Sequence, residues 1–480
     1  MKKTILNIIF AVTLITYSHH TQGQAHNVSA GYQKPTDPLV INNLEQWQDM
    51  KFGLFMHWGT YSQWGIVESW SLCPEDEGWT QRKKEHGSTY YEYVKNYENL
   101  QKTFNPTQFI PEKWAKAAKS AGMKYVVFTT KHHDGFAMFD TKESVYKITS
   151  PNTPFSSNPR ANITKEIFDA FRKDNFKIGA YFSKPDWHTE YYWWSYFPPK
   201  DRNVNYDPTK YPERWSQFKN YTYNQLNELT SEYGKVDILW LDGGWVRPFK
   251  TIDPAVEWQR TIKTEQDIDM DRIGTMARKN QPGIIVVDRT VPGKWENYVT
   301  PEQAVPDHTL DIPWESCITM GDSFSYVPND NYKPTKKIIE TLIKIISRGG
   351  NYLLNIAPGP NGDFDKAAYD RLQEISNWMN INESAVFATR PIAPFHIEDY
   401  YYTKSKDNKI INVFHIQENN KEYVSTNQFE FEIPNTIKIR DIKLLGSKER
   451  IKYQIKDGKI FINTSKNKST YASVFQIVLI

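Results

Sequence analysis

Residues 236–245 read VDILWLDGGW, an apolar run that ends in an aspartate, two glycines and a tryptophan. Continuous β-branched and aromatic residues are typical of a strand that is covered on both faces. Asp242 ends the run, and the two glycines after it allow the backbone and a ligand to approach each other closely. A carboxylate here is placed as a nucleophile, although a loop or helix-capping aspartate is the alternative for this residue taken alone.

Similar runs recur on both sides of this stretch and alternate with helical patterns from about residue 45 to about residue 390. The strands are expected at 51–56, 124–130, 177–183, 236–241, 284–288 and 352–356. The helices are expected at 111–120, 162–173, 211–232, 257–280, 334–347 and 366–380. This alternation predicts an α/β protein with a parallel sheet or barrel rather than a sandwich.

The sequence pattern changes after about residue 392, where short runs of alternating apolar and polar residues are separated by Asn, Asp, Gly and Lys. The runs are 410–416, 429–433, 451–455 and 473–480. Alternation of apolar and polar residues predicts strands with one buried face, and hence an antiparallel β domain. We therefore expect an α/β domain over residues 26–390 and a β domain over residues 391–480.

The first 25 residues form a separate unit, in which two lysines precede an apolar run from Ile5 to Tyr17 and small residues follow at Gly23 and Ala25. This order is typical of a cleaved secretory signal peptide and predicts a periplasmic or secreted protein. The run is too short to span a bilayer, and no later window supplies the ~20 apolar residues of a transmembrane helix. We therefore expect an exported protein without a membrane span.

The composition of the chain bears on its binding partners and on its two cysteines. Lys and Arg number 59 against 56 Asp and Glu, with both signs spread along the chain, so no basic stripe predicts a nucleic-acid partner. Aromatic residues make up 15% of the chain, which fits stacking on sugar faces as well as an ordinary core. Cys73 and Cys317 have no CxxC partner, which excludes zinc held by thiolates and leaves one long-range disulfide or two buried thiols.

Polar and aromatic side chains crowd the carboxyl ends of the expected strands. In a parallel barrel these ends point to one face, so residues far apart in the sequence meet there. The ends are His57-Trp58, His132-His133-Asp134, Tyr181 with Asp186-Trp187-His188, Trp240 with Asp242, and Asp288-Arg289.

The adjacent histidines raise the question of a metal ion. His132 and His133 could be zinc ligands, but neighbouring side chains on an extended segment point in opposite directions. Hydrogen bonds to sugar hydroxyls explain the pair with fewer demands, and a structural role stays open. Arg289 is expected either to orient a carboxylate or a substrate oxygen or to pair with Asp288. Phe324 either contacts an apolar substrate face or belongs to the core.

Two glutamates further along the chain are candidate proton donors. Glu302 follows Thr-Pro and Glu315 follows Pro-Trp. A rigid or aromatic neighbour can raise the pKa of a carboxyl group by desolvation until it serves as an acid.

Five motifs together resemble the α-L-fucosidases of glycoside hydrolase family 29. They are KFGLFMHWG at 51–59, KHHDGF at 131–136, LWLDG at 239–243, WE at 314–315 and GGNYLLNI at 349–356. The resemblance implies a (β/α)8-like TIM barrel, somewhat irregular, followed by a C-terminal antiparallel β-sandwich. It also implies retaining hydrolysis of terminal α-L-fucose from oligosaccharides or glycoconjugates, with no metal and no cofactor.

By position, Asp242 resembles the nucleophile of that family and Glu302 its acid/base, with Glu315 as the alternative acid/base or a substrate-positioning residue. The residues that resemble its fucose-binding shell are His57, Glu68, His132, His133, Tyr181, Trp240, Arg289 and Phe324. The family often has Glu-Trp, whereas here Ser69 separates Glu68 from Trp70.

The segment 72–100 is expected to be a rim loop that shapes the choice of leaving group. The alternative functions are a metal-dependent barrel hydrolase and a catalytically silent carbohydrate-binding protein.

Overall fold

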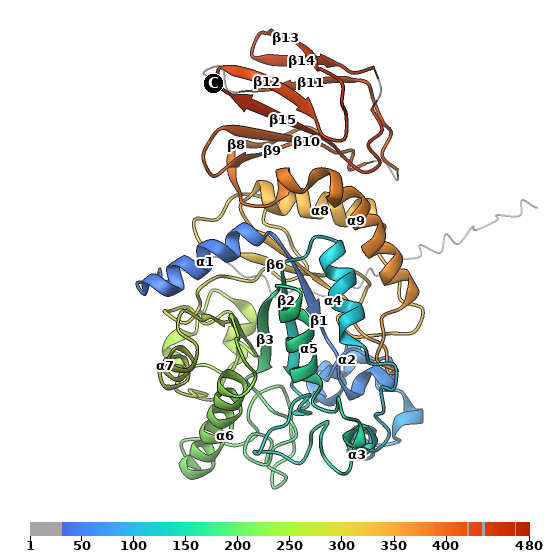
Figure 1. Ribbon diagram of the computed structural model, residues 1–480. Helices are drawn as coiled ribbons and strands as arrows, with labels where there is room; N and C mark the ends of the chain where they lie inside the picture. The colour runs from blue at the N-terminus through green and yellow to red at the C-terminus, as the bar shows by residue number, and fades with distance from the viewer. Residues whose placement is uncertain (1–30, 420–421, 434–436, 466) are drawn as a thin grey trace, which may run out of the picture.

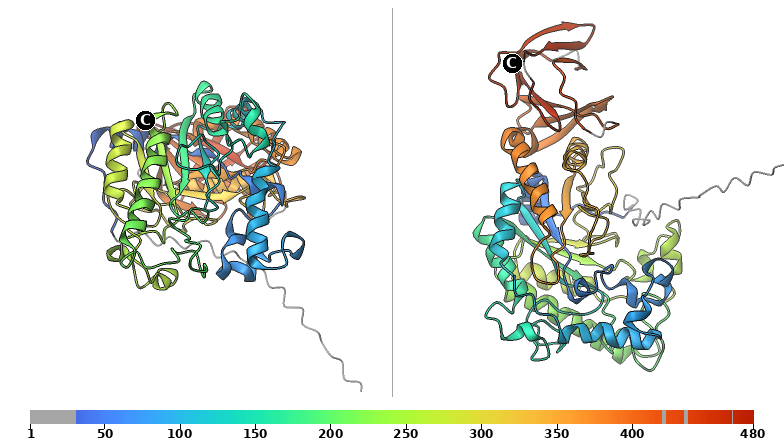
Figure 2. Two further views of the ribbon diagram at one scale, coloured as in Figure 1. Left: turned by 90° about the horizontal axis from the view of Figure 1, so that it is seen from below. Right: turned by 90° about the vertical axis from the view of Figure 1, so that its right-hand side faces the viewer.

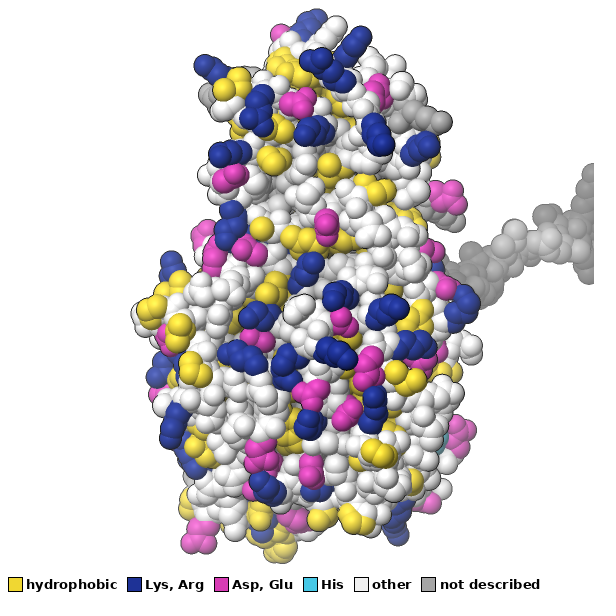
Figure 3. Space-filling model, in the orientation of Figure 1, with side chains coloured by type: hydrophobic (Ala, Val, Ile, Leu, Met, Phe, Trp, Pro, Cys, Tyr) yellow, Lys and Arg dark blue, Asp and Glu magenta, His cyan; other side chains and the backbone are white. Residues whose placement is uncertain are grey.

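The computed structural model describes residues 31–419, 422–433, 437–465 and 467–480 (Figure 1). The expected signal peptide lies outside these residues. No helix in the described ranges is long and apolar enough to cross a membrane. On the face drawn in Figure 3, positive and negative side chains are interspersed.

A parallel sheet forms the centre of the larger part of the molecule, and in the described residues it has seven strands in the order β5-β4-β3-β2-β1-β7-β6. The strands are β1 (Phe52–Met56), β2 (Tyr125–Lys131), β3 (Lys177–Ser183), β4 (Ile238–Asp242), β5 (Ile285–Asp288), β6 (Glu315–Thr319) and β7 (Asn351–Asn355). All six strands expected in this part of the chain are present. Strand β6 was missed, because its sequence ESCIT lacks an apolar run.

The sheet is a half-barrel rather than a clearly closed eight-stranded barrel, so the expectation of a (β/α)8-like barrel is met only in part. Its two edge strands are β5 and β6. Between them runs an extended segment, residues 296–303, which touches its neighbours through isolated bridges: Val287 with Glu296, Val299 with Trp314, and Glu302 with Cys317. Prolines at 301, 306 and 313 stand in this region. Because proline cannot donate a hydrogen bond to a strand ladder, a regular strand does not form here.

Helices lie along the outside of the sheet (Figures 1 and 2). They are α4 (Pro111–Ser120), α5 (Ile163–Lys173), α6 (Pro212–Ser231), α7 (Met270–Asn280), α8 (Thr335–Ser347) and α9 (Lys366–Val386). Helix α1 (Pro38–Met50) differs, because its Leu44 and Trp47 pack with strand residues of the opposite, inner face of the sheet. Two short helices, α2 (Glu77–Thr80) and α3 (Tyr90–Glu98), lie in the insertion between β1 and α4. The helix expected at 257–280 is wrong over its first half. Asp269 caps α7 by accepting a hydrogen bond from the backbone of Arg272 at 3.1 Å, and this cap starts the helix at Met270.

The C-terminal strands form two antiparallel sheets, ordered β12-β15-β10-β9-β8 and β11-β14-β13. The strands are β8 (Thr389–Ile397), β9 (Tyr400–Ser405), β10 (Ile410–His415), β11 (Gln428–Glu432), β12 (Ile439–Leu444), β13 (Lys452–Lys456), β14 (Lys459–Asn463) and β15 (Ser473–Leu479). Side chains from both sheets share one hydrophobic core. These sheets lie at the end of the molecule opposite α2 and α3 (Figure 2). Ion pairs from Arg390 and Lys406 to Asp49, at 2.8 and 2.9 Å, tie them to α1.

Both cysteines lie in the described part of the chain, and both are buried and free. Of the two alternatives for Cys73 and Cys317, the structure therefore has the pair of buried thiols.

A test of this packing is Gly53→Ala in β1. Gly53 lies opposite Tyr125 of β2, and a Cβ at Gly53 would come within 2.4 Å of the tyrosine ring. The ring must move, and with it the hydroxyl that Tyr125 donates to the buried Glu315. We expect a loss of about 1–3 kcal/mol in the free energy of unfolding, measured by denaturant titration. Gly78→Ala is the matched control, because a Cβ at Gly78 has no neighbour within 4 Å. Equal stability of the two variants would contradict the packing described.

Candidate active site

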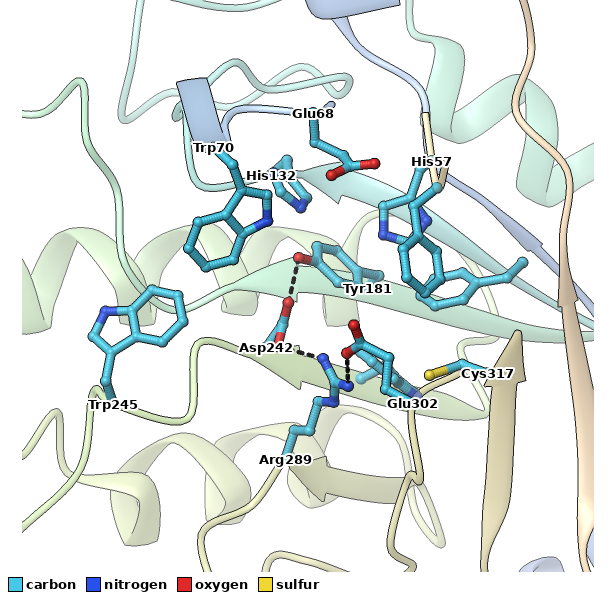
Figure 4. A pocket seen from close by; sticks show the side chains of 13 residues that line it. His57, Glu68, Trp70, His132, Tyr181, Asp242, Trp245, Arg289, Glu302 and Cys317 are labelled. Carbon is cyan, nitrogen blue, oxygen red and sulfur yellow. Dashed lines mark hydrogen bonds and ion pairs between the residues drawn. The ribbon is translucent and has the colours of Figure 1, made fainter. Parts of the chain in front are cut away.

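A pocket opens at the carboxyl ends of the parallel strands (Figure 4). The space between its lining side chains amounts to about 460 Å³, part of which is open to solvent. It is lined by Phe55, His57, Glu68, Trp70, His132, Tyr181, Trp240, Asp242, Trp245, Arg289, Glu302, Cys317 and Phe324. The structure thus brings together all the site residues expected from the sequence except His133 and Glu315.

Asp242 ends β4 and faces the centre of the pocket. Its carboxylate accepts hydrogen bonds from the Tyr181 hydroxyl at 2.8 Å and from Nη1 of Arg289 at 3.0 Å. Burial alone would raise the pKa of Asp242, but the Arg289 guanidinium holds it well below the ordinary aspartate value. Asp242 is therefore ionised at neutral pH, as a carboxylate nucleophile must be.

Glu302 reaches the same pocket from the extended segment between β5 and β6. Its carboxylate pairs with Nη2 of Arg289, so one guanidinium holds Asp242 and Glu302 together. Arg289 is itself buried, and its Nε donates to the Thr300 hydroxyl at 3.1 Å. Gln303, the next residue, has a left-handed backbone with φ of 51°, and its N–H donates to the Cys317 carbonyl at 2.9 Å. The backbone on both sides of Glu302 is therefore fixed to β6.

The three histidines are buried, and burial lowers the pKa of His57 to about 4, that of His133 to about 3, and that of His132 well below the ordinary value. Each imidazole is therefore neutral at neutral pH and has one donor and one acceptor nitrogen. In each ring Nδ1 contacts a polar side chain, namely Asn355 for His57, Ser69 for His132 and Ser183 for His133. Nε2 of His57 and of His132 is thus left for a ligand in the pocket.

His132 and His133 do not point in opposite directions, so that expectation is wrong. The chain leaves β2 at Lys131 and turns, which brings the two ring centroids to 4.2 Å from each other. His132 lines the pocket, whereas His133 lies behind it, edge-on to Trp70 at 4.9 Å. Nε2 of His133 is 3.8 Å from Oδ2 of Asp242.

The same geometry bears on the metal alternative. Ligand atoms of His132, His133 and Asp242 lie within 4.8 Å of one another. However, both oxygens of Asp242 already accept hydrogen bonds, and the positive charge of Arg289 is 3.0 Å from one of them. A second cation at this carboxylate would be repelled by the guanidinium, so the donor set fits a metal ion poorly.

Glu68 provides a third acidic group in the pocket. It is buried, and burial raises its pKa to about 7, with a further contribution from the charge of Glu302. Its Oε1 has no hydrogen-bond partner among the described residues. A protonated carboxyl group with a vacant oxygen suits recognition of a substrate hydroxyl.

Aromatic rings form the apolar wall of the pocket. Trp240 stacks on Tyr181 at 5.4 Å between ring centroids, and Phe55 contacts Trp240 at 5.2 Å. The ring centroid of Phe324 lies 4.9 Å from that of His57, and Phe324 is partly exposed. Such a wall fits the apolar face or a methyl group of a sugar.

Glu315, the alternative candidate for the acid/base or for substrate positioning, does not line the pocket. It is the first residue of β6 and is fully buried behind Trp240. Its carboxyl group accepts hydrogen bonds from Tyr125, Tyr298 and Nε1 of Trp240. Burial raises its pKa to about 7. Glu315 therefore supports the aromatic wall from behind and does not contact the cavity.

Four lining residues were not predicted from the sequence, namely Phe55, Trp70, Trp245 and Cys317. Phe55 is two residues before His57, a spacing that places both on one face of a strand and could have revealed it. Trp70 lines the pocket in spite of the inserted Ser69, and the Ser69 hydroxyl contacts Nδ1 of His132 instead. Trp245 directly follows the two glycines after Asp242.

Two acidic groups that face one pocket, with neutral imidazoles and aromatic walls around them, are what cleavage of a glycosidic bond requires, and the protein is a glycoside hydrolase. The family model for alpha-L-fucosidase matches residues 19–384, and the chain belongs to this family.

Comparisons with individual proteins agree with this assignment. The chain is 29% identical over 392 residues to the tissue alpha-L-fucosidase of Rattus norvegicus, an alignment that covers 77% of the chain and 75% of the relative. It is 28% identical over 386 residues to a putative alpha-L-fucosidase of Caenorhabditis elegans, an alignment that covers 76% of this chain and 71% of the relative. Among solved structures, alpha-L-fucosidase isoenzyme 1 from Paenibacillus thiaminolyticus superimposes with a TM-score of 0.73 at 25% identity, covering 92% of this chain and 100% of that one. An alpha-L-fucosidase from Bacteroides thetaiotaomicron shares the fold at 23% identity, with a TM-score of 0.72, and the superposition covers 94% of this chain and 97% of that one.

The raised pKa of Glu68 predicts a pH dependence. Below pH 7 the neutral carboxyl can donate to a substrate hydroxyl, whereas above pH 7 it adds a second negative charge to the pocket beside that of Asp242. We expect kcat/KM of the wild type to fall above about pH 7 for this reason. Glu68→Gln, which stays neutral, should lose this dependence and retain a lower, flatter profile. Profiles of the same shape in the two proteins would show that Glu68 does not titrate in this range.

Proposed function

We propose that the protein is a retaining, exo-acting α-L-fucosidase that releases terminal α-L-fucose from glycans or glycoconjugates by double displacement. The observation that carries the proposal is the binding of Asp242 and Glu302 to the two terminal nitrogens of one guanidinium. Retaining enzymes hold their carboxyl groups ~5–5.5 Å apart, whereas inverting enzymes leave room for a water molecule between them. Two groups bridged by a single guanidinium fit the closer arrangement.

In the proposed reaction the Asp242 carboxylate attacks the anomeric carbon while Glu302 donates a proton to the departing oxygen. This step forms a fucosyl ester on Asp242 and releases the alcohol. Glu302 then takes a proton from water, the hydroxide attacks the same carbon, and the ester bond breaks to free fucose and the Asp242 carboxylate. The configuration is inverted twice and so retained.

The remaining residues of the pocket bind the sugar in this proposal. Nε2 of His57 and of His132, together with the Glu68 carboxyl, hydrogen-bond its hydroxyl groups. Trp240 and Phe324 contact the C5 methyl group and the apolar ring face. An apolar contact of methyl size distinguishes substrates by roughly 1–3 kcal/mol, so some hydrolysis of the matching galactoside is expected.

The nucleophile is tested by Asp242→Gly. We expect kcat/KM for an aryl α-L-fucoside to fall by on the order of 10⁴-fold or more, because the covalent step is lost. Binding of free fucose, measured by calorimetry, should persist. Azide should restore turnover and give a fucosyl azide of inverted configuration. A wild type that binds fucose without hydrolysing it would favour a silent binding protein, and loss of activity with a chelator would favour a metal-dependent hydrolase.

The acid/base is tested by comparing Glu302→Gln with Glu315→Gln. Glu302→Gln should lower kcat/KM for fucosides of poor leaving groups by about 10²–10⁴-fold, and much less for activated aryl fucosides that need no proton. Glu315→Gln is the control, since Glu315 is buried behind Trp240. It should affect both substrate types alike and act mainly on stability. A leaving-group dependence in Glu315→Gln, and none in Glu302→Gln, would reverse the assignment.

A further inference from the structure

The rim of the pocket continues outward from Trp70 along the segment that contains α2. Trp70, Asp242, Glu302 and Phe324 are the partly exposed members of the lining, so the pocket opens between them. A leaving group attached to a sugar at Asp242 must leave through this opening, past Glu302. The surface next to Trp70 is therefore within reach of the leaving group.

Arg202 lies against this rim. Its guanidinium carbon is 5.2 Å from the ring centroid of Trp70 and 5.5 Å from that of Trp245, and both rings line the pocket. Its backbone carbonyl accepts hydrogen bonds from Nε1 of Trp187 at 3.2 Å and from the Tyr192 hydroxyl at 3.1 Å. The loop that carries Arg202 is thus fixed to the core beside the pocket.

Two acidic side chains face this arginine. Nε of Arg202 donates to Oε1 of Glu75 at 2.5 Å, and a terminal nitrogen lies 3.5 Å from Oδ1 of Asp76. The neighbouring Glu77 is already paired with Arg82. One positive charge therefore meets two negative charges at the rim, and the surplus is negative.

Trp79 completes the surface. It is 43% exposed, and its ring centroid is 6.3 Å from that of Trp70. Its Nε1 donates to Oδ1 of Asp76 at 2.7 Å, which fixes the ring in place. An exposed tryptophan held in one orientation by a charged partner is a ready platform for the apolar face of a sugar ring.

We propose that Trp79, Arg202 and Glu75 form a subsite for the leaving group and that it accepts a neutral pyranose. The ring of this second sugar stacks on Trp79, while Arg202 and Glu75 hydrogen-bond its hydroxyl groups. The surplus negative charge of Glu75 and Asp76 repels an acidic sugar at this position. The inference rests on the proposed fucosidase activity and extends it to the class of the second sugar.

The test compares Trp79→Ala with the wild type on two substrates, a fucosylated neutral disaccharide and α-L-fucosyl fluoride. The fluoride carries the same sugar but has no ring in the leaving group. We expect kcat/KM for the oligosaccharide to fall roughly three- to tenfold and kcat/KM for the fluoride to stay unchanged. Tyr91→Ala is the matched control, because Tyr91 is a 66% exposed aromatic residue on α3 of the same insertion. It should change neither value.

A second variant, Glu75→Gln, tests the charge preference. The amide removes the surplus charge and retains an oxygen that can accept from Arg202. We expect kcat/KM for a fucosylated acidic sugar to rise several-fold relative to its neutral counterpart. An unchanged ratio would overturn the preference for neutral sugars.

The outcomes separate this inference from the proposed function. If Trp79→Ala leaves the ratio of oligosaccharide to fluoride activity unchanged, or lowers both activities equally, the leaving-group subsite is refuted while the fucosidase stands. If the wild type does not hydrolyse the fluoride, the proposed function itself fails.

Discussion

The site depends on one buried guanidinium. Arg289 directly follows β5, and from there it binds Asp242 at the end of β4 and Glu302 on the segment leading to β6. Without this positive charge, two carboxylates in a small cavity would repel each other, and burial would favour their neutral forms. With it, Asp242 stays ionised in a place where burial alone would raise its pKa. Arg289 thus sets both the charge and the spacing on which the proposed chemistry relies.

The gap in the sheet explains how a single arginine reaches both acids. A regular eighth strand between β5 and β6 would place alternate side chains on opposite faces of the ladder. Instead, residues 296–303 form isolated bridges and scattered backbone hydrogen bonds to their neighbours without becoming a regular strand, and Gln303 adopts a left-handed backbone directly after Glu302. The Glu302 side chain can therefore lie across the opening toward Arg289. Irregular backbone at this place is consistent with the general concentration of unusual conformations at functional sites.

Patterns with a simple geometric origin were readable in the sequence, and those that depend on packing were not. His57, Asp242 and Arg289 end or follow apolar runs, and the parallel sheet brings such ends together. Strand β6 escaped detection because its neighbours, rather than its own polar sequence, make it a strand. The orientation of His133 depends on a turn after Lys131, and the contribution of Trp70 depends on how an insertion folds back over the pocket. Neither feature has a local sequence signal.

The three glutamates of this region show why residue type alone could not assign roles. Glu302 and Glu315 both follow prolines within two residues, so both were candidates for the acid/base on sequence alone. Their surroundings differ completely. The Glu315 carboxyl group accepts hydrogen bonds from three aromatic side chains, and these bonds hold Trp240 and two tyrosines in place. Glu68 is equally buried and has a similarly raised pKa, yet one of its oxygens faces the cavity with no partner in the described residues. Glu302 remains partly exposed and is bound by a cation. A proton donor must reach the glycosidic oxygen, so access to the cavity, rather than the pKa shift alone, decides among the three.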